Sequence, residues 1–173
     1  MTSLCPPKAY VLLVIFYLQT RPVPVVPVLQ DLTSPNKGGK GRTAGPIIEG
    51  NDCYFCDDLG YIESLGYGAR TRNTESLGQL LVGFFGYLAN GFSFRDSVIS
   101  IRTGQVLQKS EKEWTAKQNS RRDRYWWCIE DPFELSHNLG RVVSLLFLLS
   151  HNLGRVVSLL FFSSLFFLLP RVS

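Results

Sequence analysis

A phrase of thirteen residues, LSHNLGRVVSLLF, occurs twice near the end of the sequence, beginning at Leu135 and again fourteen positions later at Leu149. Repeats that build a fold diverge as each copy adapts to its neighbours, and solenoid periods run from about 20 to 50 residues. An identical copy at this spacing therefore does not predict a repeat architecture. It indicates a local duplication or a fault in the gene model; the alternative is a helix extended for contact with a membrane or a partner.

The repeat also carries much of the basic and hydrophobic character of the chain. The 173 residues are 45% hydrophobic and have a formal net charge of +4, which suits one globular domain with a core and excludes a disordered or fibrous chain. Residues 135–173 hold three arginines and no acidic residue, so most of the positive charge lies there. A balance of this size permits a nucleic acid or an anionic lipid as partner without requiring either.

Apolar segments at the two ends of the sequence are candidates for membrane contact. The uncharged segment of the tail that precedes Pro170, residues 156–169, has fourteen residues, fewer than the roughly 20 that span a bilayer. Membrane contact through the tail is therefore the less favoured interpretation. Residues 9–18 resemble the hydrophobic region of a signal peptide, but QTRPVPVV follows them where a small-residue cleavage site belongs, and a buried helix is favoured.

The cysteines predict a reducing compartment. Cys5, Cys53, Cys56 and Cys128 lack the spacing of a disulfide framework, so we expect the cytoplasm, with the nucleus and the mitochondrion as alternatives. Cys53 and Cys56 have the spacing of a zinc knuckle or a redox pair, but zinc needs four ligands and no second pair lies near. Two ordinary thiols beside a strand are favoured, and we expect no metal site in this chain.

Hydrophobic periodicity predicts an α+β fold that is mostly helical, with one small sheet. A helix is expected over residues 9–20, ending before Pro22, and a flexible loop over 32–45. Short strands are expected at 47–48 and 54–55, and a loop over 60–72. A second, amphipathic helix is capped by Asn73 or Thr74 and has an apolar face. That face consists of Leu77, Leu80, Leu81, Phe84 and Leu88.

Two strands are expected after the second helix, between residues 97 and 129. Residues 97–102, SVISIR, alternate like a half-buried strand and lead into a turn at Thr103 and Gly104. A polar stretch follows, and residues 125–129 form the second strand candidate. Asp131 and Pro132 end it.

A basic and aromatic stretch, residues 109–127, is compatible with single-stranded RNA, because basic side chains neutralise phosphates while aromatic rings stack on unpaired bases. The alternative is a solvated segment with its aromatic rings turned to the core. The candidate phosphate contacts in it are Lys109, Lys112, Lys117, Arg121 and Arg122.

Residues 130–141 gather three carboxylates, an imidazole, an amide and a guanidinium around a proline turn, with Ser136 as a candidate helix cap. Such a cluster suits hydrogen-bond readout of a nucleobase edge, since a mismatched base leaves a buried group unpaired. An acid/base pair and a capped turn with local ion pairs remain alternatives.

The phrase CIEDPFELSHNLGRVV resembles the closing motif of the poly(A)-polymerase-associated domain of RNA terminal nucleotidyltransferases, particularly the terminal uridylyltransferase branch. The resemblance extends upstream in register. NTESLGQLLVGFFGYLANGFSFRDSVISIRTG is similar to the first helix and strand of that domain, and AYVLLVIFYLQTRPVPVVPVLQDL is similar to the preceding helical region. Together the matching segments, residues 9–32, 46–59 and 73–147, cover 113 residues.

The resemblance implies transfer of uridylate from UTP to RNA 3′ ends, with two Mg²⁺ or Mn²⁺ ions held by three aspartates of an N-terminal catalytic lobe. No Gly-Ser followed by a D-x-D pair occurs in the sequence, so we expect no catalytic residue in this chain and a fold that lacks that lobe. Carried over by position, the nucleobase-binding residues are Asp131, Glu134, His137 and Asn138, and His137 resembles the histidine that favours uracil over adenine. Arg141 joins the phosphate-binding set.

The sequence departs from the family where Cys5-Pro6-Pro7-Lys8 replaces an expected Ser-Ser-Tyr that stacks on the base and holds the triphosphate. We therefore expect a fragment that retains the nucleobase-reading domain, with RNA 3′ ends, UTP and a separate catalytic lobe as partners. Poly(A)-polymerase-type adenylyl transfer and a non-enzymatic remnant that binds a membrane or a partner are the alternatives.

Four segments are expected. They are a remnant of the preceding helical region (1–34), a loop-rich linker (35–72), the poly(A)-polymerase-associated domain (73–148) and the duplicated hydrophobic tail (149–173).

Overall fold

The computed structural model describes residues 7–34, 45–93, 95–115 and 127–142. Within these residues, three α-helices and two small antiparallel sheets confirm an α+β fold, although the sequence predicted a single sheet. In chain order the elements are α1 (Pro7–Gln19), β1 (Ile47–Ile48), β2 (Asn51–Asp52), α2 (Leu59–Ser64), a 3-10 helix (Gly68–Arg70), α3 (Leu77–Gly86), a π-helix (Tyr87–Gly91), β3 (Ser97–Ser100), β4 (Gln105–Gln108) and a second 3-10 helix (Leu139–Val142).

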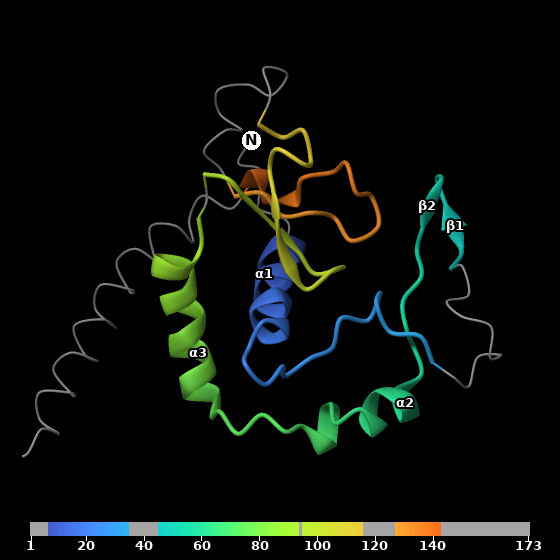
Figure 1. Ribbon diagram of the computed structural model, residues 1–173, viewed down its shortest axis with the longest axis vertical. Helices are drawn as coiled ribbons and strands as arrows, with labels where there is room; N and C mark the ends of the chain where they lie inside the picture. The colour runs from blue at the N-terminus through green and yellow to red at the C-terminus, as the bar shows by residue number, and fades with distance from the viewer. Residues whose placement is uncertain (1–6, 35–44, 94, 116–126, 143–173) are drawn as a thin grey trace, which may run out of the picture.

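Helix α1 lies at the centre of the molecule, beside α3 and the β3–β4 hairpin (Figure 1). Its sequence is apolar on nearly every face, and Leu13, Phe16 and Tyr17 are buried. The predicted helix over residues 9–20 is confirmed, with a start at Pro7, where a helix tolerates proline. After the helix, the Gln19 side-chain amide donates to the carbonyls of Pro27 and Ile101, each at 3.1 Å, and so ties the proline-rich turn to the hairpin.

Helix α3 begins later than the sequence predicted. Ser76 is the N-cap, and with Gln79 it forms a capping box in which each side chain accepts from the other residue's backbone N–H. The predicted cap at Asn73 or Thr74 is wrong, because the Asn73 side chain is bonded instead to Val23 O and to Glu75. Because the Asn73 side chain makes a contact with a distant segment and does not cap the helix, Ser76 is the cap and α3 starts at Leu77.

The apolar face predicted for α3 is only partly buried. Phe84 and Leu88 face the core, whereas Leu77 is 83% exposed and Leu81 is 55% exposed. Leu88 lies in the π-helix that continues α3, where the wider turn alters the angular spacing of side chains.

The strand predicted over residues 97–102 is confirmed over its first four residues as β3, and β4 is a partner strand that the sequence did not predict. Val98 and Ile99 pair with Leu107 and Val106. All four residues of β3 are buried, rather than alternate ones as predicted, whereas the residues of β4 are largely exposed and give no strand pattern in the sequence. The predicted turn is confirmed at Gly104, where φ is +63°, a backbone conformation that favours glycine.

Only part of the strand predicted over residues 125–129 lies in the described residues, and there it is reduced to a bridge. Ile129 pairs in parallel with Ile99, and Glu130 N donates to Ile99 O at 2.8 Å. Residues 125 and 126 lie outside the described residues.

The β1–β2 hairpin and α2 lie at the periphery, away from α1 (Figure 1). The strand predicted at residues 54–55 is wrong: Tyr54 is buried, and its hydroxyl donates to Leu32 O at 2.8 Å rather than extending a sheet. The loop predicted over 60–72 contains most of α2, because the Asp58 side chain caps that helix by accepting from Tyr61 N.

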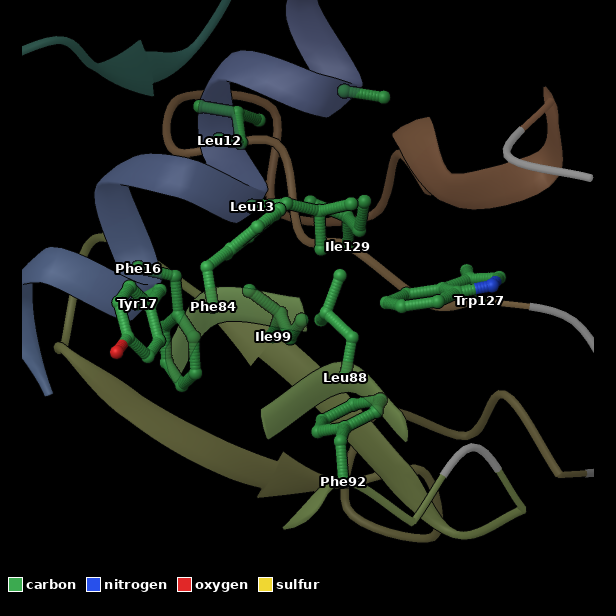
Figure 2. Close-up of a cluster of buried hydrophobic side chains, with 11 residues drawn as sticks. Leu12, Leu13, Phe16, Tyr17, Phe84, Leu88, Phe92, Ile99, Trp127 and Ile129 are labelled. Atoms are coloured by element: carbon green, nitrogen blue, oxygen red, sulfur yellow. The ribbon is translucent and has the colours of Figure 1, made fainter. Parts of the chain in front are cut away.

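A single cluster of buried side chains joins α1, the end of α3, β3 and the segment that starts at Trp127 (Figure 2). The Phe92 and Trp127 rings are stacked, with their centres 5.9 Å apart, and Ile99 and Ile129 are fully buried. The backbone leaves this core directly into residues 131–138. In the described part of the chain, none of the helices has both the length and the apolar character needed to cross a bilayer.

Candidate nucleobase-binding site

Residues 131–138 form a loop with a closed base, called here the 131–138 loop. Glu130 and Asn138 pair as an antiparallel bridge, and Leu139 N donates to Ile129 O at 2.9 Å. One step further out, Asp131 N donates to His137 O at 3.1 Å. The two ends of the loop are therefore fixed on the buried core, and its tip faces outward.

Asp131 shapes the turn that follows it. One carboxylate oxygen, Oδ1, accepts from the backbone N–H groups of Phe133 at 2.9 Å and Glu134 at 3.1 Å. This is the local bonding by which aspartate favours turns. His137 N donates to Glu134 O at 2.8 Å and completes the loop. The predicted base-binding residue Asp131 thus has a structural role in this conformation.

Glu134 and His137 form an exposed pair of side chains on the loop. His137 Nδ1 lies 3.3 Å from Glu134 Oε2, and the two side chains are 50% and 59% exposed, respectively. Because a carboxylate only accepts, the contact orients the ring with Nδ1 as donor. Nε2 is then available to a ligand, so the structure brings these two predicted residues together in accessible form.

Asn138 faces inward. Its Oδ1 accepts from Ile129 N at 3.0 Å and from Gly140 N at 2.8 Å, and its Nδ2 donates to Cys128 Sγ at 3.4 Å. These bonds brace the loop base and open the 3-10 helix Leu139–Val142, where the sequence had suggested Ser136 as a cap. Position 140 requires glycine here, since a Cβ would overlap with the backbone oxygen of Trp127.

Glu130 lies beneath the loop with a fully buried carboxylate. Its Oε2 accepts from Ser100 Oγ at 2.5 Å and from Arg102 Nε at 3.3 Å, while Oε1 accepts from Lys112 Nζ at 2.7 Å and from Arg102 Nη2 at 3.3 Å. Burial raises the pKa of this carboxyl, but the hydrogen bonds from Lys112, Ser100 and Arg102 outweigh it and hold the pKa below its usual value. The group is therefore an anion at neutral pH.

The predicted phosphate-binding residues are not assembled into one surface in the described part of the chain. Lys109 is only 1% exposed, and the Lys112 ammonium is bonded to Glu130 and to Leu135 O. Arg141 lies in the 3-10 helix Leu139–Val142. The remaining three, Lys117, Arg121 and Arg122, lie outside the described residues.

Sequence reasoning missed Ser100, Arg102 and Gln30 as supports of the loop. Ser100 and Arg102 occur two residues apart in a strand-like segment, a spacing that places side chains on one face, and this was the available signal. Gln30 Nε2 donates to Pro132 O at 2.8 Å across 102 residues of sequence, a contact that no local pattern indicates.

A cavity of about 270 Å³ adjoins this support. Its lining is polar and comes from the proline-rich turn and the end of the β3–β4 hairpin: Gln30, Asp31, Arg102, Thr103 and Gln105. Arg102 therefore faces both this cavity and the buried Glu130 carboxylate.

The residues that the structure describes do not fit a metal ion. None of them form a group of three or more histidine, cysteine, aspartate or glutamate side chains that could hold one. Cys53 and Cys56 are free cysteines. We therefore derive no step through Mg²⁺ or Mn²⁺ from this chain.

Comparisons with known proteins point to one family. The family model described as Cid1 family poly A polymerase matches residues 76–137. Terminal uridylyltransferase 7 of Homo sapiens is 37% identical over 137 residues, which are 79% of this chain and 8% of that protein. Terminal uridylyltransferase cid1 of Schizosaccharomyces pombe is 40% identical over 144 residues, which are 78% of this chain and 32% of that protein. A solved structure of Cid1 in complex with its short product ApU matches with a TM-score of 0.66 and 35% sequence identity, over 88% of this chain and 44% of that one.

The β3–β4 hairpin and the 131–138 loop are thus parts of a PAP-associated domain. The chain belongs to the family of Cid1-like terminal uridylyltransferases and poly(A) polymerases, as the sequence resemblance implied. Poly(A) RNA polymerases are among its relatives, including cid11 of Schizosaccharomyces pombe at 35% identity over 71% of this chain. The chain spans less than a third of the length of the two uridylyltransferases compared above.

Proposed function

We propose that this chain is the nucleobase-reading part of an RNA terminal uridylyltransferase, which adds uridylate from UTP to RNA 3′ ends. The observation that carries the proposal is the exposed Glu134–His137 pair on a loop whose two ends are fixed to the core. The similarity to terminal uridylyltransferases supports the same activity.

The pair has the chemistry to tell uracil from adenine. When both ring nitrogens carry a hydrogen, His137 donates from Nδ1 to Glu134 and from Nε2 to a ligand. Uracil presents an O4 acceptor at the position where adenine presents an N6 amino donor, as thymine and adenine do. A donor at Nε2 is satisfied by the O4 acceptor of uracil and opposed by the N6 donor of adenine.

RNA 3′ ends and UTP are the proposed partners. A divalent cation would supply stabilisation of the attacking and leaving oxygens in such a reaction, with ligands outside the described residues of this chain. We include the cytoplasm as the proposed location, in keeping with the cysteine pattern.

The test is nucleotide addition by the full protein that contains this chain. An RNA primer is incubated with each of the four nucleoside triphosphates in turn, and products are resolved by length. We expect extension with UTP in clear preference to ATP. Extension with ATP in preference to UTP would instead support the poly(A)-polymerase assignment that relatives such as cid11 suggest.

A further inference from the structure

Two side chains from distant segments hold the 131–138 loop by its backbone. Gln30 Nε2 donates to Pro132 O at 2.8 Å, and Lys112 Nζ donates to Leu135 O at 2.5 Å. Leu135 lies between the two residues of the exposed pair. A bond to its carbonyl fixes the peptide plane next to Glu134, so the Lys112 contact acts where the pair is oriented.

Lys112 is itself held in place. Its ammonium lies 2.7 Å from Glu130 Oε1 and 5.2 Å from the centre of the Trp114 ring, and its side chain is only 17% exposed. Glu130 in turn is bonded to Ser100 and Arg102 on the hairpin. A chain of hydrogen bonds thus runs from Ser100, in the buried strand β3, through Glu130 and Lys112 to the Leu135 carbonyl.

We propose that Lys112, held by Glu130, is a positioning residue that sets the nucleobase preference of the 131–138 loop. The inference rests on the proposed function, because it assigns to Lys112 the orientation of the pair that reads the base. It also replaces the phosphate contact that the sequence predicted for Lys112. A cation bonded to an internal carboxylate and a backbone carbonyl has little capacity left for a phosphate.

The physical reason is the exposure of the loop tip. Phe133 and Leu135 are 37% and 40% exposed, so little burial holds this segment. Without the Lys112 contact, the Asp131 turn and the Gln30 contact remain, but the peptide between Glu134 and Ser136 loses its external donor. The pair then samples several orientations, and discrimination between uracil and adenine falls because it depends on one fixed donor direction.

The first test measures amide hydrogen exchange of residues 131–138 in the full chain. We expect Lys112→Met to speed exchange in the loop at least about tenfold relative to α3, in keeping with a lost hydrogen bond to a charged group. Lys112→Arg should restore protection, because a guanidinium can donate to both Glu130 and Leu135 O. Arg72→Met, which removes an exposed cation outside the network, is the matched control and should have no effect.

A double variant separates positioning from simple loss of a buried pair. Lys112→Met leaves the Glu130 carboxylate short of one partner, and adding Glu130→Gln removes that unpaired charge. We expect the double variant to keep the fast loop exchange, because Leu135 O still has no donor. Restored protection in the double variant, or a loop in Lys112→Met as protected as in Arg72→Met, would overturn the positioning role.

The second test is kinetic and uses the full protein that contains this chain. Lys112→Met should lower the ratio of kcat/KM for UTP to that for ATP about tenfold and leave the KM for RNA unchanged. A raised KM for RNA with an unchanged ratio would overturn the proposal in favour of a phosphate contact. A wild-type protein that adds no nucleotide would contradict the proposed function and the selectivity role with it, whereas the exchange result decides by itself whether Lys112 braces the loop.

Discussion

At the residue scale, Glu130 joins three side chains from outside its own segment: Ser100, Arg102 and Lys112. A buried carboxylate is stable only when its oxygens are bonded, and here both are. Glu130 was read from the sequence as one of three similar carboxylates in residues 130–141. The structure gives the three carboxylates different roles. Glu130 supports the 131–138 loop from the core, Asp131 shapes the turn, and Glu134 faces outward.

Glu130→Gln should be less stable than the wild type at pH 7 by about 1–3 kcal/mol, because Lys112 and Arg102 lose a charged acceptor. The folded-state pKa of Glu130 is lowered, so its contribution is full above the ordinary glutamate pKa of about 4.3 and is lost as the pH falls through the folded pKa. The variant should therefore lose less stability than the wild type below about pH 4.3. Urea unfolding of the variant and the wild type between pH 3 and 7 measures this difference in the pH dependence of the free energy of unfolding.

Glu63→Gln is the control, because that carboxylate is exposed on α2. Equal pH slopes for Glu130→Gln and the wild type would contradict the assigned role of Glu130.

At the element scale, the start of α3 depends on Ser76 rather than on the residues that the sequence favoured. Ser76→Ala should lower the free energy of unfolding by about 1 kcal/mol, the usual cost of losing an N-cap. Thr74→Ala is the matched control: Thr74 is exposed and precedes the cap, so its effect should stay within about 0.5 kcal/mol. Equal losses in the two variants would show that the helix begins elsewhere.

The 3-10 helix that follows the loop requires glycine at its second residue. Gly140→Ala should destabilise the protein and loosen the loop base, because the new Cβ would meet Trp127 O, a backbone atom that cannot turn away. Gly86→Ala is the control, since nothing lies within 4 Å of a Cβ there, and alanine in a helix is about 0.5–1 kcal/mol better than glycine. The melting temperatures of the two variants measure the difference. A higher melting temperature for Gly140→Ala than for Gly86→Ala would contradict the close approach of Trp127 O to position 140.

The elements that the sequence predicted well are those whose signal is local. The helix over 9–20 follows from an apolar run ended by Pro22, and the strand predicted over 97–102, of which residues 97–100 form β3, follows from an apolar segment ended by the turn at Gly104. Strand β4 was not predicted, because its polar, exposed residues give no strand pattern of their own and pair with the β3 backbone. The cap of α3 has a local signal in Ser76 and Gln79, but Asn73 is an equally good cap by residue type, and its long-range bond to Val23 O gives no sequence signal.

The candidate site also contains residues that the sequence could predict and residues that it could not. Glu134 and His137 could be selected from residue type and resemblance, and they are adjacent in space because they are three residues apart in one loop. Lys112 was predicted to contact phosphate because the sequence shows its charge. The sequence does not show that this charge is largely buried and paired with Glu130. The Gln30 contact spans 102 residues and gave no local signal.

At the scale of the whole molecule, the core couples α1 to the loop through Ile99 and Ile129 (Figure 2). Ile99→Ala should lower the free energy of unfolding by about 2–5 kcal/mol, because a fully buried side chain is removed. Ile47→Ala, at a site that is 63% exposed, should cost less than about 1 kcal/mol. Denaturant titrations of the two variants measure the difference, and similar costs would contradict the placement of the core.

The central claim is that His137 reads the nucleobase from a fixed loop. The most direct measurement is the ratio of kcat/KM for UTP to that for ATP, on an RNA primer, in the full protein that contains this chain. We predict a ratio well above one in the wild type, at least about tenfold lower in His137→Ala, and unchanged in Ser136→Ala, an exposed neighbour in the same loop. A ratio that His137→Ala leaves unchanged would contradict the claim.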